Sequence, residues 1–141
     1  MSSHPTEQLV EDVTWAQFNS AAGYTGLRGV DLAESGLTPE RGLIGSVLRD
    51  AILRLNPQLK NDKDAVEQVV RTLRAAPHPT FLENNRWFHR QLVDGVEVEY
   101  ADKTSGGRRG TRAMLLNFDD STKNDFLVVR QLTMSTAAGG T

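Results

Sequence analysis

The chain has 141 residues, enough for about one domain with a hydrophobic core, and 38% of them are hydrophobic. Its net charge of −2 excludes a globally basic nucleic-acid-binding protein, so any contact with DNA must come from a local patch. Cysteine is absent, which excludes disulfides, thiolate zinc sites and cysteine nucleophiles. The sequence has no signal peptide and no run near the roughly 20 apolar residues of a membrane span, so we expect a soluble, cytoplasmic protein.

A first helix is predicted to begin at Thr6 and to end at Gly23. Thr6 is a favourable N-cap residue, and apolar residues recur at near-helical spacing after it. Glu7 and Glu11 lie four residues apart and therefore share one face of this helix. Such a pair of carboxylates could hold a divalent cation; the alternative is that both are simply solvated.

Residues 24–36 contain several glycines and are predicted to form a loop. A second helix is predicted to start at Thr38-Pro39, because proline is favoured at the first helical position, and to end before Asn56-Pro57. Its apolar stripe faces the core, and its arginines either touch phosphate or form a solvated face. These arginines are Arg41, Arg49 and Arg54.

Asp62 is predicted to cap a further amphipathic helix that carries Val66, Val69, Val70 and Leu73. The run Ala76-Pro77-His78-Pro79 breaks the chain, and His78 is interpreted as a loop residue. A short helical piece is predicted over residues 85–93, closed by Asp94-Gly95. Its apolar residues Phe88, Leu92 and Val93 are expected to face the core.

The opposite side of this short helix is expected to present Arg86, His89 and Arg90 next to Trp87. A basic cluster beside an aromatic ring is typical of nucleic-acid-binding surfaces. The alternative is a purely structural role for these residues.

The second half of the chain predicts strands. Residues 96–100 alternate strictly between apolar and polar residues, residues 111–118 alternate again, and residues 126–129 are all apolar, as in a strand covered on both faces. We therefore predict an α+β chain in which helices precede an antiparallel meander of 96–100, 111–118 and 125–134. The last strand is expected to lack a neighbour, and its open edge to favour pairing with another copy.

Between the first two of these strands, residues 102–110 are predicted to form a flexible, basic hairpin tip. Arg108, Arg109 and Arg112 make the densest positive patch in the chain and are candidates for phosphate contact. A loop of glycine and arginine is also simply soluble, so both interpretations stay open. The sequence shows no glycine-rich phosphate loop, no paired histidines with zinc spacing and no serine on a nucleophile elbow.

Three long segments resemble one family in matching order. Residues 48–57 read Leu-Arg-Asp-Ala-Ile-Leu-Arg-Leu-Asn-Pro, residues 85–96 read Asn-Arg-Trp-Phe-His-Arg-Gln-Leu-Val-Asp-Gly-Val, and residues 124–131 read Asn-Asp-Phe-Leu-Val-Val-Arg-Gln. Together they resemble the N-terminal region of the restriction (R) subunit of type I restriction–modification enzymes. The Glu7-x-x-x-Glu11 helix and Gly23-Tyr24 also match, whereas Asn117 and Arg130 stand where the family usually has Asp and Asn.

The resemblance implies a partial PD-(D/E)xK restriction-endonuclease-like α/β fold. It also implies a parent enzyme that uses ATP to translocate DNA and Mg²⁺ to cleave it, in complex with methylation and specificity subunits. The family's metal-binding Asp and Glu-x-Lys lie on strands after residue 134. We therefore expect residues 1–141 to be a single N-terminal fragment with no catalytic residue and no cofactor of its own, inactive alone, in which Glu11 is at most an accessory metal ligand.

The fragment itself is expected to scaffold the nuclease core and to contact the backbone of double-stranded DNA. The residues expected at this contact are Arg86, His89, Arg90, Arg108, Arg109 and Arg112. One alternative is a module that docks onto the methylation and specificity subunits. Another is a decayed, stand-alone remnant of a restriction gene.

Overall fold

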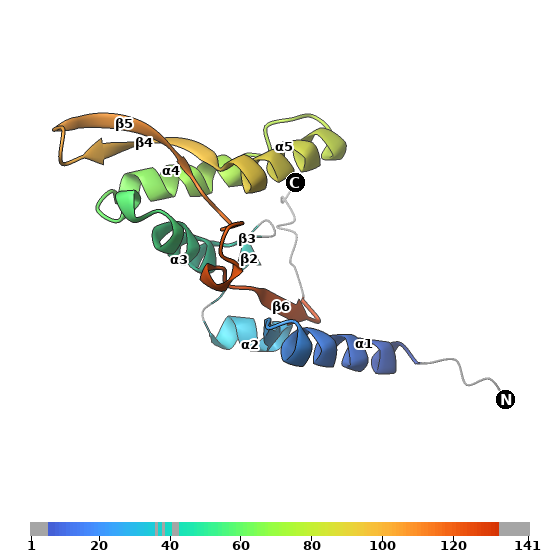
Figure 1. Ribbon diagram of the computed structural model, residues 1–141. Coiled ribbons are helices and arrows are strands. Elements are labelled where there is room, and N and C mark those ends of the chain that lie inside the picture. The colour runs from blue at the N-terminus through green and yellow to red at the C-terminus, as the bar shows by residue number, and fades with distance from the viewer. Residues whose placement is uncertain (1–5, 36, 38, 41–42, 133–141) are drawn as a thin grey trace. The chain divides into compact units, whose positions relative to one another are not determined.

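The computed structural model describes residues 6–35, 37, 39–40 and 43–132. The chain divides into two compact units (Figure 1). Unit 1 consists of Met1–Thr38 together with Asp125–Thr141, and unit 2 consists of Pro39–Asn124. Helices and strands occur in both units, in agreement with the predicted α+β class. None of the helices in the described ranges has the length and apolar character needed to cross a bilayer.

Unit 1 combines a helix with a pair of parallel strands. Helix α1 (Glu7–Ala16) begins as predicted at Thr6, whose hydroxyl oxygen accepts a hydrogen bond from the Leu9 N–H at 3.3 Å, and it continues as a π-helical turn, Gln17–Ala21. Strand β1 (Thr25–Arg28) leads into the short helix α2 (Gly29–Glu34) and pairs in parallel with β6 (Leu127–Arg130).

This pairing corrects two predictions. Residues 25–28 form a strand and not a loop, and β6 is not the third strand of an antiparallel meander. The glycine that suggested a loop, Gly26, instead allows close contact between strand and helix, since an added Cβ would lie 2.6 Å from the Trp15 ring. The Gly26 N–H also donates to Asn19 Oδ1 at 3.0 Å, which fixes β1 against the π-helical turn.

Unit 2 begins with two short strands, β2 (Pro39–Glu40) and β3 (Leu43–Ile44), which pair antiparallel. The predicted helix start at Thr38-Pro39 is therefore wrong, because Pro39 lies in a strand, where its missing N–H is tolerated at an edge. Helix α3 (Gly45–Leu55) begins six residues later than Pro39 and ends as predicted at Asn56. Thr38 and Arg41 lie outside the described residues.

Helix α4 (Lys63–Arg74) lies at the centre of the core of unit 2. Its predicted cap is confirmed, since Asp62 Oδ1 accepts from the Ala65 N–H at 3.0 Å. The other oxygen, Oδ2, accepts from the Ala101 N–H at 2.8 Å and so ties the start of α4 to strand β4 (Val96–Asp102). The four predicted apolar residues of α4 are buried and pack with residues of α3 and β4. The main members of this core are Ile52, Val66, Val69, Val70, Leu73, Val96 and Val98.

Strand β4 pairs antiparallel with β5 (Gly107–Ala113), and the hairpin extends along α4 (Figure 1). The predicted alternation is confirmed, with Val96 and Val98 buried and Glu97 and Glu99 exposed. Because Asp102 pairs with Gly107 at the tip, β4 extends two residues beyond the predicted 96–100, and β5 begins four residues before the predicted 111–118; β5 also ends at Ala113, five residues earlier than predicted. The arginines expected in a flexible tip therefore lie on β5.

Three asparagine side chains each hold the backbone of another residue through two hydrogen bonds, one accepted by Oδ1 and one donated by Nδ2. We refer to these as amide clamps. The clamp on Met114 occupies both backbone polar groups of the residue that follows β5. These groups therefore do not bond to a neighbouring strand, and the predicted strand does not continue to residue 118. The clamps are Asn56 on Met114 (2.7 and 2.8 Å), Asn84 on His78 (2.9 and 2.8 Å) and Asn124 on Asn117 (2.7 and 2.7 Å).

Candidate functional site

Helix α5 (Phe81–Asp94) carries the first group of candidate residues and starts four residues earlier than predicted. Thr80 caps it: the hydroxyl accepts from the Glu83 N–H at 3.2 Å and donates to the Glu83 carboxylate at 2.7 Å. The helix ends at Gly95, whose φ of +83° and close approach to the Ala113 carbonyl suit glycine alone. Both ends of α5 are therefore fixed by local sequence.

The core-facing side of α5 is only partly as predicted. Phe88 and Leu92 pack against the core of unit 2, whereas Val93 is 44% exposed. The reason is the helical period, which places Val93 on the same side as Arg86 and His89.

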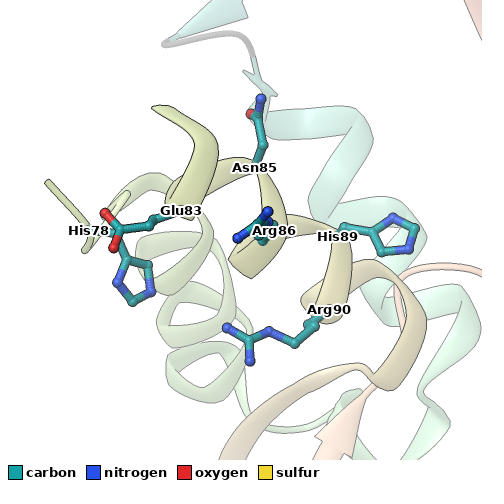
Figure 2. A pocket seen from close by; sticks show the side chains of 6 residues that line it. All are labelled: His78, Glu83, Asn85, Arg86, His89 and Arg90. Atoms are coloured by element: carbon teal, nitrogen blue, oxygen red, sulfur yellow. The ribbon is translucent and has the colours of Figure 1, made fainter. Parts of the chain in front are cut away.

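The three predicted residues of α5 lie around one open depression of about 710 Å³. Figure 2 shows Arg86 at its centre, with Arg90 and His78 directed toward one side and His89 toward the other. Three further residues that line the depression were not predicted as site residues from the sequence. These are His78, Glu83 and Asn85. The run Thr80-Phe-Leu-Glu83 has the Thr-x-x-Glu pattern of a capping box and would have located the helix start, and with it the helical spacing of Glu83, Arg86 and Arg90.

Arginines outnumber carboxylates among the residues that line this depression. Arg86 and Arg90 are exposed, and neither forms an ion pair with another residue that the structure describes. Among the lining residues, Glu83 is the sole carboxylate, and it is engaged by the Thr80 hydroxyl. The two guanidinium groups are therefore available for an anionic ligand.

The three arginines of β5 differ because each faces a carboxylate. The hydrogen bonds that Asp102 accepts from the Thr104 N–H and the Ser105 hydroxyl hold the pKa of its carboxyl below the usual range, so this group stays charged near neutral pH. The hairpin is thus a ladder of opposite charges and not a positive patch. Its pairs are Arg108–Glu99 (3.5 Å), Arg109–Asp102 (3.8 Å) and Arg112–Glu97 (3.0 Å).

Arg112 is the hairpin arginine that approaches α5. It lines a second depression, of about 410 Å³, together with Arg90. Asp94 and Glu97 line the same depression, so positive and negative groups are balanced there. Of the six residues predicted to contact DNA, the three on α5 therefore form no ion pair with another described residue, whereas each of the three on β5 is paired with a carboxylate.

Glu11, the predicted accessory metal ligand, lies on α1 in unit 1. It is half-buried, and its carboxylate accepts from Gln131 Nε2 at 3.5 Å. The adjacent Asp12 forms an ion pair with Arg130 at 2.9 Å, and the Arg130 guanidinium lies 5.3 Å from the centre of the Trp15 ring. Within the described ranges, no three acidic or histidine side chains converge in an arrangement that could hold a metal ion.

Comparison with known proteins identifies the chain. Residues 4–141 match the family described as the type I restriction enzyme R protein N terminus. The chain belongs to this family. The resemblance inferred from the three sequence segments is thereby confirmed.

Two curated relatives of this R protein N-terminal region agree with the assignment. The HindI endonuclease subunit of a type I restriction enzyme from Haemophilus influenzae is 33% identical over 93 residues, which cover 66% of this chain and 8% of that protein. The MjaIXP endonuclease subunit from Methanocaldococcus jannaschii is 31% identical over 106 residues, which cover 69% of this chain and 10% of that protein. The matched segments thus span a tenth or less of either relative. No solved structure matches the chain.

Proposed function

We propose that this R protein N-terminal region serves a restriction endonuclease subunit by contacting the backbone of double-stranded DNA through α5. The observation that supports this is the pair Arg86 and Arg90, which line one depression and have no ionic partner among the described residues. Exposed guanidinium groups of this kind bind phosphate oxygens through charge-assisted hydrogen bonds. His89 adds a third donor at the far side of the same depression.

The hairpin arginines play a smaller part in this proposal. To reach a phosphate, Arg108, Arg109 or Arg112 must first leave a carboxylate on the neighbouring strand. These pairs are exposed and individually weak, so the hairpin can still rearrange near DNA. Its net contribution to binding is nevertheless expected to be small, because the carboxylates repel the same phosphates.

The test is binding of the chain to a short DNA duplex, measured by fluorescence anisotropy over a range of salt concentrations. The double variant Arg86→Ala/Arg90→Ala should bind more weakly and lower the salt slope by about 1 for each lost phosphate contact. Arg108→Ala/Arg109→Ala removes the same charge from the hairpin and serves as the matched control. Equal affinity of the α5 variant and the parent chain would rule the proposal out.

A second candidate function is docking onto another subunit, and a specific observation favours it. Phe81, Leu82 and Val93 of α5 are 91%, 59% and 44% exposed. Exposed apolar side chains grouped with arginines are typical of protein–protein interfaces. The proposed partners are the methylation and specificity subunits that act with an R subunit.

The two candidates are separated by a pull-down with the assembled methylation and specificity subunits. Leu82→Ser/Val93→Ser should abolish capture and leave DNA binding intact if α5 is a docking face. Arg86→Ala/Arg90→Ala should show the reverse pattern if α5 binds DNA. The apolar pair and the basic pair lie on the same helix, so each variant is the control for the other.

Unit 1 is proposed to scaffold the core of a PD-(D/E)xK nuclease in the whole subunit. Parallel strands are normally covered on both faces, and the half-buried β1–β6 pair fits such a central position. In the complete enzyme, with its Mg²⁺ and ATP, Glu11 would be an accessory metal ligand. Glu11→Gln in the complete subunit should therefore reduce DNA cleavage without abolishing it, with Glu7→Gln as control; unchanged cleavage would remove this role.

Self-association is proposed as a further property of the isolated chain. In the described part of unit 1, β1 and β6 pair with each other, and each has one open edge. Open edges of short sheets favour pairing with a second copy. Sedimentation velocity should show association that increases with protein concentration, and a strict monomer at high concentration would contradict it.

A further inference from the structure

We infer that His78 completes a binding site for a single phosphate group at one end of the α5 depression, together with Arg86 and Arg90. The inference rests on the proposed DNA contact. It adds to that contact a residue from outside α5 and a defined position for one phosphodiester of the backbone.

His78 is held in a fixed position and is not part of a loose loop. The amide clamp from Asn84 accepts from its N–H at 2.9 Å and donates to its carbonyl oxygen at 2.8 Å. Its ring lies edge-on to Trp87, with 6.4 Å between the ring centres. The flanking Pro77 and Pro79 restrict the backbone on both sides.

The backbone that leads into His78 is strained. Ala76 has a φ of +41°, a conformation that residues with a Cβ rarely adopt. Strained backbone of this kind persists where surrounding contacts over-determine it, and it is frequent at ligand sites. Here the Asn84 clamp and the contact with the Trp87 ring are the constraining contacts, and together they hold the His78 imidazole beside α5.

The placement brings His78 to the arginine end of the depression. Figure 2 shows the His78 ring and the Arg90 guanidinium on the same side of Arg86, whereas His89 and Asn85 point elsewhere. An imidazole N–H and two guanidinium groups provide donors from two chain segments. Planar guanidinium groups bind phosphate oxygens bidentately, so these two arginines, together with the imidazole, favour the binding of a single phosphate group.

The negative charge of Glu83 repels a phosphate that binds at the His78 end of the depression. Figure 2 shows Glu83 and His78 on the same side of Arg86, and Glu83 lines the depression. A phosphate bound between His78 and Arg90 is repelled by this charge, whereas one bound between Arg86 and His89 is farther from it. Removing the charge of Glu83 therefore reports where the phosphate sits. Glu83→Gln keeps a side chain that can still pair with Thr80 at the helix cap.

The experiment measures duplex affinity of the full 141-residue chain by anisotropy. His78→Ala should weaken binding about tenfold, as expected for the loss of one charge-assisted hydrogen bond. His78→Lys should recover most of this loss, and Glu83→Gln should bind more tightly than the parent. Lys103→Ala, which removes an exposed charge from the hairpin tip, should leave affinity unchanged.

A second measurement uses inorganic phosphate as the probe. Its addition should shift the ring-proton NMR signals of His78 at lower concentrations than those of His89. If His78→Ala proves unfolded by circular dichroism, Glu83→Gln and the NMR titration decide the question without it.

The outcomes separate this inference from the proposed function. Weaker binding of Arg86→Ala/Arg90→Ala, together with unchanged binding of His78→Ala and Glu83→Gln, overturns the role of His78 and leaves the DNA contact standing. Unchanged binding of all these variants overturns both. Weaker binding of His78→Ala that His78→Lys does not restore, with no effect of Glu83→Gln, shows that His78 supports the fold and does not bind phosphate.

Discussion

Asn56 holds both backbone polar groups of Met114. The Met114 N–H donates to Oδ1 at 2.7 Å, and its carbonyl oxygen accepts from Nδ2 at 2.8 Å. The same Nδ2 also donates to the Ile52 carbonyl at 2.8 Å, and Asn56 is only 1% exposed. The side chain thereby joins the end of α3 to the residue that follows β5. It belongs to the Leu-Asn-Pro run that resembles the R-subunit family, so a physical role can be assigned to that part of the resemblance.

Replacement of this side chain is expected to be severe. Asn56→Ala leaves the part-buried backbone groups of Met114 without these partners and should lower the free energy of unfolding by about 3 kcal/mol. Urea denaturation measures the free energy of unfolding, and the m-value should be the same for the variant and the parent chain. Asn61→Ala, an exposed asparagine on the following loop, is the matched control and should change stability by less than about 0.5 kcal/mol. A similar small change for Asn56→Ala would show that the clamp contributes little.

Gly26 should not tolerate a larger residue. An added Cβ would lie 2.6 Å from the Trp15 ring and from Asn19 Nδ2, so Gly26→Ala should destabilise unit 1 by about 2 kcal/mol through overpacking. Hydrogen exchange at the amides of β1 and β6 should become faster, while the amides of α4 should be unaffected. Gly110→Ala on β5, with open space around it, is the control. Equal protection of β1 in the parent chain and Gly26→Ala would contradict the close packing.

Asp62 should make the free energy of unfolding depend on pH in the acidic range. Hydrogen bonds from the Ala101 N–H and then the Ala65 N–H lower the pKa of its carboxyl in the folded state. A lowered pKa contributes stability above the unfolded value of about 3.9, and this stability is lost as pH falls through the folded value. The difference in unfolding free energy between pH 7 and pH 3 should therefore be smaller for Asp62→Asn than for the parent chain. Asp64→Asn, which removes an exposed carboxylate two residues later in the first turn of α4, is the matched control.

The ion pairs on the β4–β5 hairpin should limit the contribution of its arginines to DNA binding. Arg108→Ala/Arg112→Ala should change duplex affinity by less than about twofold, because each arginine already faces a carboxylate. Glu97→Gln/Glu99→Gln should instead strengthen binding, since it releases the same two arginines. Anisotropy at low salt measures both effects. A loss from the arginine variant as large as that from Arg86→Ala/Arg90→Ala would place the hairpin at the DNA as well.

Local signals in the sequence account for most of what could be predicted of unit 2. The cap at Asp62, the apolar stripe of α4 and the alternation of β4 depend on neighbouring residues, and the structure confirms them. The strand at residues 25–28 could not be found in this way, because its partner β6 is distant in sequence and its glycine reflects contact with Trp15. The position at which β5 ends was not predicted, because it depends on the hydrogen bonds between Met114 and Asn56, a residue far earlier in the chain.

The same distinction applies to the candidate site. Helical spacing was sufficient to group Arg86, His89 and Arg90. The placement of His78 depends on the Asn84 clamp, which no periodicity encodes. The pairing of the β5 arginines with Glu97 and Glu99 required the hairpin register, and the predicted tip was too long to give it.

The parallel pairing of β1 with β6 has a consequence for biosynthesis. All of unit 2 lies between these strands in sequence, so β1 leaves the ribosome well before its partner has been translated. Unit 2 can form during this interval from contacts within a continuous segment, whereas unit 1 must wait for a closure between distant segments, which is intrinsically slow. Until β6 has been translated, the backbone groups of β1 that pair with it therefore remain without this partner.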